Sequence, residues 1–131
     1  MEQNYLVDTN IIIYYLKDAI PQEQLIHVNN IFTHSFHISS ITKIELLGWH
    51  RIDENQRTQI AEFLSKATVF YVDEEIERIT IRLKQEKKMP IADAIIAATA
   101  LLHKLILVTR NEADFQHIPE LTVFNPFSEK A

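Results

Sequence analysis

The stretch PIADAIIAATALL, residues 90–102, decides the fold of this chain. It predicts a helix, because Pro90 suits a first helical position and Ala and Leu dominate the residues that follow. Nearly all of these residues are small or apolar, so we expect a helix that is buried on all sides. Asp93 is the exception. Its carboxylate either stabilises the positive end of the helix dipole or is held by a rigid buried element towards other acidic groups.

Length and composition limit the classes of function. With 131 residues the chain can bury a real hydrophobic core, and we treat residues 1–131 as a single domain. The absence of cysteine excludes disulfides, thiolate nucleophiles and Cys-based zinc sites. Gly48 is the single glycine, which excludes the P-loop and the dinucleotide-binding fingerprint. A net charge of −5 argues against broad electrostatic binding of nucleic acid but allows acids gathered around a cation.

Membrane association and histidine-based metal binding receive no support from the sequence. No apolar run approaches the ~20 residues of a membrane span, and the N-terminus lacks the pattern of a signal peptide. We therefore expect a cytoplasmic protein. The six histidines form neither an HxH nor an HExxH pattern, and we expect His34 and His37 to be ordinary surface residues.

Short apolar runs alternate with helical patterns along the chain. Strands are predicted at 5–7, 36–38, 69–72, 105–108 and 121–124, the last at the edge of the sheet. Helices are predicted between them, over 9–16, 21–32, from Ser39 onwards with Ile41, Ile44, Leu47 and Trp49, from the capping box at Asp53, from Asp73, over 90–102 and within 109–115. This alternation argues for an α/β fold, with a central parallel sheet and helices on both faces.

Acidic residues follow the predicted strands or begin the predicted helices. Asp8 follows the first strand, Asp114 lies in the segment after the fourth, and Asp93 begins the helix that leads into that fourth strand. These positions converge on the carboxyl edge of a parallel sheet, where ligands bind. Glu45 joins them if its helix packs over the same edge. Alternatively, Asp8 is a helix cap and Glu45 is a solvated mid-helix residue.

Several carboxylates in one pocket need a cation. Two unit charges ~4 Å apart repel by about 4 kcal/mol at an effective dielectric constant near 20. Helix capping does not offset several such terms, so the acids either protonate or surround a hard cation. Carboxylate ligands without cysteine or paired histidine favour Mg²⁺ or Mn²⁺.

At these residues the chain resembles the PIN-domain family, and within it the VapC-type toxin ribonucleases of bacterial toxin–antitoxin systems. The resemblance rests on four stretches: VDTN at 7–10, TKIELL at 42–47, ADAIIAATA at 92–100 and TRNEADF at 109–115. Each is weakly specific alone. They occur in the family's order and span the chain from about Asn4 to Phe124, so the ordered set is fairly specific. The implied fold is a PIN-like three-layer domain with a central parallel sheet flanked by helices.

The resemblance implies a metal-dependent ribonuclease. Asp8, Glu45 and Asp93 would form its acidic core and hold the Mg²⁺ or Mn²⁺ ion that activates water for attack on an RNA phosphodiester. The fourth family acid is replaced by Asn111, and Asp114 is the substitute one helical turn later. The family also implies a homodimer and a small antitoxin that places a basic side chain in the acidic pocket.

Further site residues follow from the chemistry of such a centre. Hydroxyl and amide side chains next to the acids are expected to orient the carboxylates by hydrogen bonds; these are Thr9, Asn10, Thr109 and Asn111. Basic side chains near the acids are expected to contact RNA phosphates; these are Lys43, Lys87, Lys88 and Arg110.

Two other classes of protein remain as alternatives. A phospho-acceptor receiver domain shares the length, the α/β sheet and an acidic Mg²⁺ pocket. It needs an acidic pair after the first strand, where only Asp8 stands, and a Lys after the fifth, which is missing after Phe124; Asp73 could supply its second Asp. The other alternative is a catalytically inactive PIN fold that only binds RNA or protein.

Overall fold

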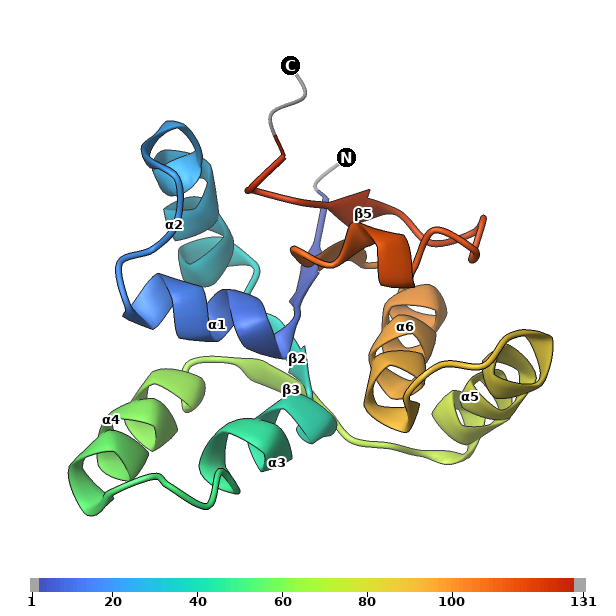
Figure 1. Ribbon diagram of the computed structural model, residues 1–131, viewed down its shortest axis with the longest axis horizontal. Coiled ribbons are helices and arrows are strands. Elements are labelled where there is room, and N and C mark those ends of the chain that lie inside the picture. Colours follow the sequence, from blue (N-terminus) through green and yellow to red (C-terminus); the bar gives the residue numbers. More distant parts are fainter. Residues whose placement is uncertain (1–2, 129–131) are drawn as a thin grey trace.

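The computed structural model describes residues 3–128 and contains a five-stranded sheet with helices on both faces (Figure 1). The strands are β1 (Tyr5–Val7), β2 (His37–Ser39), β3 (Thr68–Phe70), β4 (Ile106–Val108) and β5 (Val123–Phe124). All neighbouring pairs are parallel, in the order β3-β2-β1-β4-β5. The chain adds strands on one side of β1 first and on the other side later. The strand order, although not the strand direction, therefore reverses between β1 and β4.

The helices are α1 (Thr9–Leu16), α2 (Leu25–His34), α3 (Ser40–Leu47), α4 (Glu54–Leu64), α5 (Glu74–Glu86) and α6 (Ile91–His103), with short 3₁₀ turns η1 (Gln22–Gln24) and η2 (Glu112–Asp114). Four of the helices, α1, α3, α4 and α5, begin after a residue whose side chain caps them. The predicted capping box is present, since Asp53 accepts from the Gln56 N–H at 2.7 Å and Gln56 reaches back to the Asp53 N–H. Asp73 caps α5 by accepting from the Ile76 N–H at 2.9 Å.

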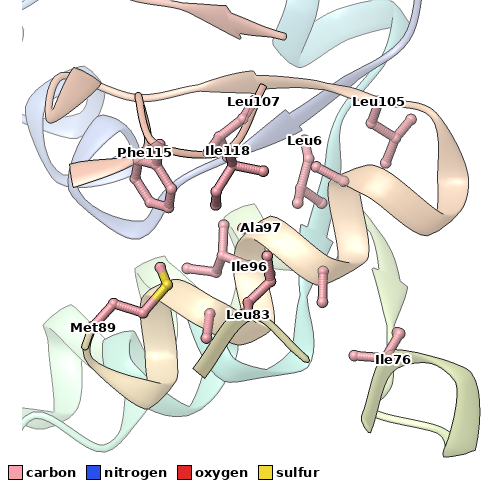
Figure 2. Packing of buried hydrophobic residues seen from close by; sticks show 13 residues of the cluster. Leu6, Ile76, Leu83, Met89, Ile96, Ala97, Leu105, Leu107, Phe115 and Ile118 are labelled. Carbon is pink, nitrogen blue, oxygen red and sulfur yellow. The ribbon is translucent and has the colours of Figure 1, made fainter. Parts of the chain in front are cut away.

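The core lies in two layers, one on each face of the sheet. Leu6 and Leu107 point to one face and pack with α5, α6 and the segment after η2, as Figure 2 shows. Val7 and Val108, the next residue along each strand, pack on the opposite face with α1, α2 and α4. Successive side chains of a strand point to opposite faces, so these apolar runs are buried on both sides. This confirms the predicted three-layer α/β arrangement.

Helix α6 is buried through its middle but not at its ends. Ala94 and all residues from 96 to 100 are buried, whereas Ile91 is 63% exposed and His103 is also exposed. The prediction of burial on all sides is therefore wrong for the two ends of the helix. Pro90 occupies the N-cap position, one residue before the predicted one.

Other differences from the predictions concern the ends of elements. The helix predicted over 21–32 is divided into η1 and α2, and the third strand ends at Phe70 rather than residue 72. Helix α3 ends at Leu47, so Trp49 lies beyond it, and Ile44 is 62% exposed. The buried side chains of α3 are Thr42, which hydrogen-bonds to Thr9 of α1, and Leu46, which packs in the same core cluster as Ile11 and Ile12. Within residues 3–128, no helix is long and apolar enough to cross a membrane.

Candidate acidic active site

Asp8 lies at the point where the strand order reverses. It follows β1, and its backbone N–H donates to Val108 at the end of the neighbouring β4. Its side chain is buried, with Oδ1 accepting from the Thr9 N–H at 2.8 Å and Oδ2 accepting from the Thr109 hydroxyl at 2.7 Å. Asp8 is therefore both the cap of α1 and a buried acid at the crevice where α/β sheets bind ligands. The two interpretations of Asp8, as a helix cap and as an acid of the site, are therefore compatible.

Glu45 is brought to the same place by α3. The Thr9 hydroxyl lies 2.6 Å from Glu45 Oε1 and 3.0 Å from the hydroxyl of Thr42. A hydroxyl has one proton to donate, and the ionised carboxylate can only accept. Thr9 therefore donates to Glu45, and Thr42 donates to Thr9. Although Glu45 is an exposed residue of α3, its carboxylate is fixed against α1 by this chain of hydrogen bonds.

Burial and neighbouring negative charges raise the pKa of two of the site acids, Asp8 and Asp93. Burial raises the pKa of Asp93 to about 6, and the negative charges of Asp8, Asp114 and Glu45 add to this rise. Burial also raises the pKa of Asp8, and the charges of Glu45 and Asp114 act in the same direction, while its hydrogen bonds with Thr109 and Thr9 oppose the rise. Such mutual effects require short separations. The fold therefore gathers four acids from four separate parts of the sequence.

Three of the four acids line one end of a pocket of about 650 Å³, and Asp114 is not among the lining residues. Asp8, Glu45 and Asp93 contribute to its wall together with Asn10 and Asn111. The remainder is largely apolar and comes from α1, α3, α4 and the segment between α3 and α4: Ile13, Leu16, Leu46, Trp49, Ile52 and Ile60. The pocket therefore combines an acidic end with an apolar extension.

Three of the predicted supporting residues line this pocket, Thr9, Asn10 and Asn111, whereas none of the four predicted basic residues does. The Asn111 N–H donates to the Thr109 hydroxyl at 3.1 Å, which leaves the Thr109 proton directed at Asp8. Lys87 and Lys88 are exposed in the segment that leads into α6, and Lys43 is half-buried on α3. Within the part of the chain that the structure describes, the basic residue that lines the pocket is Lys17, which the sequence reasoning did not select.

The donor set fits a hard divalent cation. All the candidate ligands are carboxylate oxygens, and each Asp8 oxygen accepts only one hydrogen bond from the protein, which leaves further lone pairs for a cation. Over residues 3–128, no three acidic or imidazole groups are already converged as a closed ligand set. Mg²⁺ is commonly held by one or two carboxylates and retains several waters. Asp8 and Asp93 suffice for such a site.

Two contributors escaped the sequence reasoning because nothing in their local pattern marks them. Thr42 is fully buried and hydrogen-bonds to Thr9, whereas the sequence analysis used it only as the first residue of the TKIELL stretch and gave it no role in the site. Trp49 lines the pocket from beyond the end of α3. The one available signal for Thr42 was its position three residues before Glu45, on the same side of a helix.

Comparison with known proteins is consistent with this site. The PIN domain family matches residues 5–121, so the chain belongs to the PIN-domain family. No curated protein sequence matches the chain significantly.

Solved structures narrow the class within the family. A chain of a toxin–antitoxin complex from Klebsiella pneumoniae has 31% sequence identity and a TM-score of 0.75, with 95% of this chain and 99% of that chain covered. A chain of VapBC-1 from nontypeable Haemophilus influenzae has 27% identity and a TM-score of 0.80, with 96% and 100% covered. A chain of DNA-bound VapBC from Salmonella typhimurium has 26% identity and a TM-score of 0.82, with 95% and 99% covered. The protein is a PIN domain of the VapC type.

The strand order also removes one alternative. Receiver domains have the order 2-1-3-4-5, whereas this sheet has the order β3-β2-β1-β4-β5. Asp73, which would have supplied the second receiver acid, is the cap of α5 and follows the outermost strand β3. The receiver interpretation is therefore wrong.

Proposed function

We propose that this protein is a Mg²⁺- or Mn²⁺-dependent endoribonuclease and the toxin of a type II toxin–antitoxin system in the cytoplasm. The observation that carries the proposal is the placement of Asp8, Glu45 and Asp93 on the wall of one pocket, where burial and the charges of Asp8, Asp114 and Glu45 raise the pKa of Asp93 to about 6. Four acids that repel one another in this way favour a bound cation. The family membership and the similarity to toxin–antitoxin complexes support the same function.

The residues of the site have separate roles in this mechanism. Asp8 and Asp93 would hold the metal ion, which would polarise the phosphodiester and lower the pKa of a bound water. Thr109 and the Thr9 N–H hold both oxygens of Asp8 in place. Glu45 or Asp114 orients the attacking water, or assists in holding a second ion. Lys43, Lys87, Lys88 and Arg110 contact phosphates of the RNA strand.

Cleavage of total cellular RNA and of tRNA, with and without EDTA, tests this function. Wild type should cleave in Mg²⁺ or Mn²⁺, lose activity in EDTA and leave DNA largely intact. Asp8→Ala should abolish cleavage, because it removes a buried ligand. Asp114→Ala should only weaken it, because Asn111 already replaces the family's fourth acid, and the exposed Glu62→Gln serves as the matched control. Equal activity of wild type and Asp8→Ala would indicate a contaminating ribonuclease.

The same assay decides between an active enzyme and an inactive binding module. A preparation that binds RNA but does not cleave it in any divalent metal would support the inactive PIN fold. Equal loss of activity in Asp8→Ala and Asp114→Ala would identify Asp114 as a full fourth ligand.

A small antitoxin and a second copy of the chain are the proposed protein partners. The apolar extension of the pocket suits an apolar segment of an antitoxin, and its acidic end suits a basic side chain from the same partner. Trp49 is the single tryptophan and lines the pocket, so its fluorescence reports occupation directly. A neighbouring gene for a short protein that changes this fluorescence would support the pairing. Sedimentation equilibrium tests the homodimer.

A further inference from the structure

Arg110 lies in the turn that holds the acidic site together. Its neighbours on both sides belong to the site, since Thr109 hydrogen-bonds to Asp8 and Asn111 lines the pocket. The Arg110 side chain is exposed, and its guanidinium carbon lies 4.3 Å from the ring centroid of Phe127 and 5.1 Å from that of Tyr14. The two rings contact each other with centroids 4.9 Å apart. We call Tyr14, Arg110 and Phe127 the arginine mount.

The C-terminal segment after β5 builds one side of this mount. Asn125 Nδ2 donates to the Arg110 carbonyl at 3.3 Å, so the segment is tied to the backbone of the same turn. Asn125 Oδ1 accepts from the Phe127 N–H at 2.8 Å, which directs the chain so that the Phe127 ring meets the guanidinium. Tyr14 comes from α1, one helical turn after Asn10 of the pocket wall. Three separate segments therefore converge on one cation.

Arg110 forms no ion pair with an acidic residue within the part of the chain that the structure describes. Over residues 3–128, the ion pairs of lysine and arginine are those of Arg82 with Glu86 and Glu120. Within the described residues, the Arg110 guanidinium therefore has no acidic partner and lies exposed against the two rings. Stacking on two rings is a physical means of holding it there.

We propose that the arginine mount is a phosphate-binding clasp for the RNA strand, with Arg110 as the contact and Tyr14 and Phe127 as positioning residues. This inference rests on the proposed ribonuclease function and specifies how its substrate is held. A guanidinium that lies with one side on aromatic rings still presents N–H edges that match two phosphate oxygens. In a chain of net charge −5, a fixed guanidinium in the turn between Thr109 and Asn111 attracts a phosphodiester that the acidic residues repel.

RNA affinity and its salt dependence test the clasp. The probe is a fluorescein-labelled single-stranded RNA of mixed sequence, with binding measured by anisotropy in EDTA and KM and kcat measured in Mg²⁺. Arg110→Gln should weaken binding and raise KM about tenfold, with little change in kcat. The slope of log affinity against log salt should fall by about 0.7, the value for one phosphate contact on a single strand. The exposed Arg78→Gln on α5 is the matched control and should match wild type.

The aromatic residues are tested through pairs of conservative variants. Phe127→Leu keeps an apolar side chain but removes the ring, and it should raise KM as Arg110→Gln does. Phe127→Tyr and Tyr14→Phe keep the rings, and each should have the wild-type KM. Phe127→Leu should have no further effect on KM in the Arg110→Gln background, because the ring acts only through Arg110. A merely structural role of the ring would give additive losses and would overturn its assignment as a positioning residue.

The outcomes separate this inference from the proposed function. If wild type cleaves RNA and Arg110→Gln keeps the wild-type KM and salt slope, the clasp is wrong and the ribonuclease stands. If wild type neither binds nor cleaves RNA, both are wrong. If Phe127→Leu does not fold, as judged by circular dichroism, the comparison of Arg110→Gln and Arg110→Lys with Arg78→Gln decides. Arg110→Lys keeps the charge but not the planar stack, and its KM should lie between wild type and Arg110→Gln.

Discussion

Thr109 donates a 2.7 Å hydrogen bond to Asp8 across 101 positions of sequence. The bond joins the ends of β1 and β4, the two neighbouring strands at which the strand order of the sheet reverses. It is also directional, because the Thr109 oxygen accepts from the Asn111 N–H and its single proton is left for the carboxylate. The turn that carries Asn111 and Arg110 is therefore anchored to the first acid of the site.

Removing this hydroxyl should impair the site more than the fold. We expect Thr109→Val to lower metal affinity or activity by about 10- to 100-fold, the usual effect of losing a partner that orients a ligand. Thr109→Ser should retain most of both, since it keeps the hydroxyl. Calorimetric titration with Mn²⁺ measures the affinity independently of cleavage. Wild-type affinity in Thr109→Val would show that the bond only stabilises the strand ends.

The pKa of Asp93 predicts how stability depends on pH. Its folded pKa is about 6 against an ordinary 3.8, so the folded protein holds this proton more tightly than the unfolded chain. The resulting stability is present below pH ~4 and is lost as the pH rises through about 6. Metal-free Asp93→Asn should therefore be more stable than wild type by about 1 kcal/mol near pH 7.5, after allowance for solvent screening. The difference should vanish near pH 4.

Urea denaturation in EDTA at the two pH values measures this difference, with Glu62→Gln as the control for loss of an ordinary surface carboxylate. A metal-free Asp93→Asn that is less stable than wild type at pH 7.5 would mean that the carboxylate serves mainly the dipole of α6.

Divalent metal should stabilise the folded protein by linkage. At a concentration of 100 times Kd the gain is about 2.7 kcal/mol, which should appear as a higher melting temperature in Mg²⁺ or Mn²⁺. Asp93→Asn should remove most of this gain, whereas Asp114→Ala should remove only part of it. An equal rise of melting temperature in wild type and Asp93→Asn would indicate that the metal binds elsewhere.

Thr42 should support Glu45 through Thr9. Thr42→Val has nearly the same shape but leaves the buried Thr9 oxygen without its donor, so we expect a loss of about 1 kcal/mol in stability. Activity should fall as well, because Glu45 loses its fixed position, and Thr42→Ser should restore both. Thermal melts and initial cleavage rates measure the two effects. A loss of stability at unchanged rate would restrict Thr42 to a structural role.

His117 offers a gain in stability away from the site. Both of its ring nitrogens are buried without a hydrogen-bond partner among the described residues. An unpaired buried polar group costs about 1–3 kcal/mol, so His117→Leu should raise the free energy of unfolding by about 1 kcal/mol. Chemical denaturation at neutral pH measures the change. A lower stability of His117→Leu would imply that water satisfies the imidazole in solution.

The sequence alone determined the elements and their class. Apolar runs such as 105–108 predicted buried parallel strands, and Asp53 and Asp73 predicted helix starts, because period, burial and capping are local properties. It also identified Asp8, Glu45, Asp93 and Asp114 as candidates, because each stands at the end of a strand or within a resembling motif. It did not decide whether Asp8 is a cap or a buried site acid, and it placed Ile44 and Trp49 as ordinary residues of a helix.

The tertiary structure decided what local patterns do not contain. Strand order fixed the crevice between β1 and β4, and only that order brings Thr109 to Asp8 and Thr9 to Glu45. The pKa of Asp93 depends on the charges of three residues that are distant in sequence. The contact of Arg110 with Tyr14 and Phe127 likewise joins three segments. Distances across a fold set hydrogen bonds, charge repulsion and stacking, and a one-dimensional pattern carries no distances.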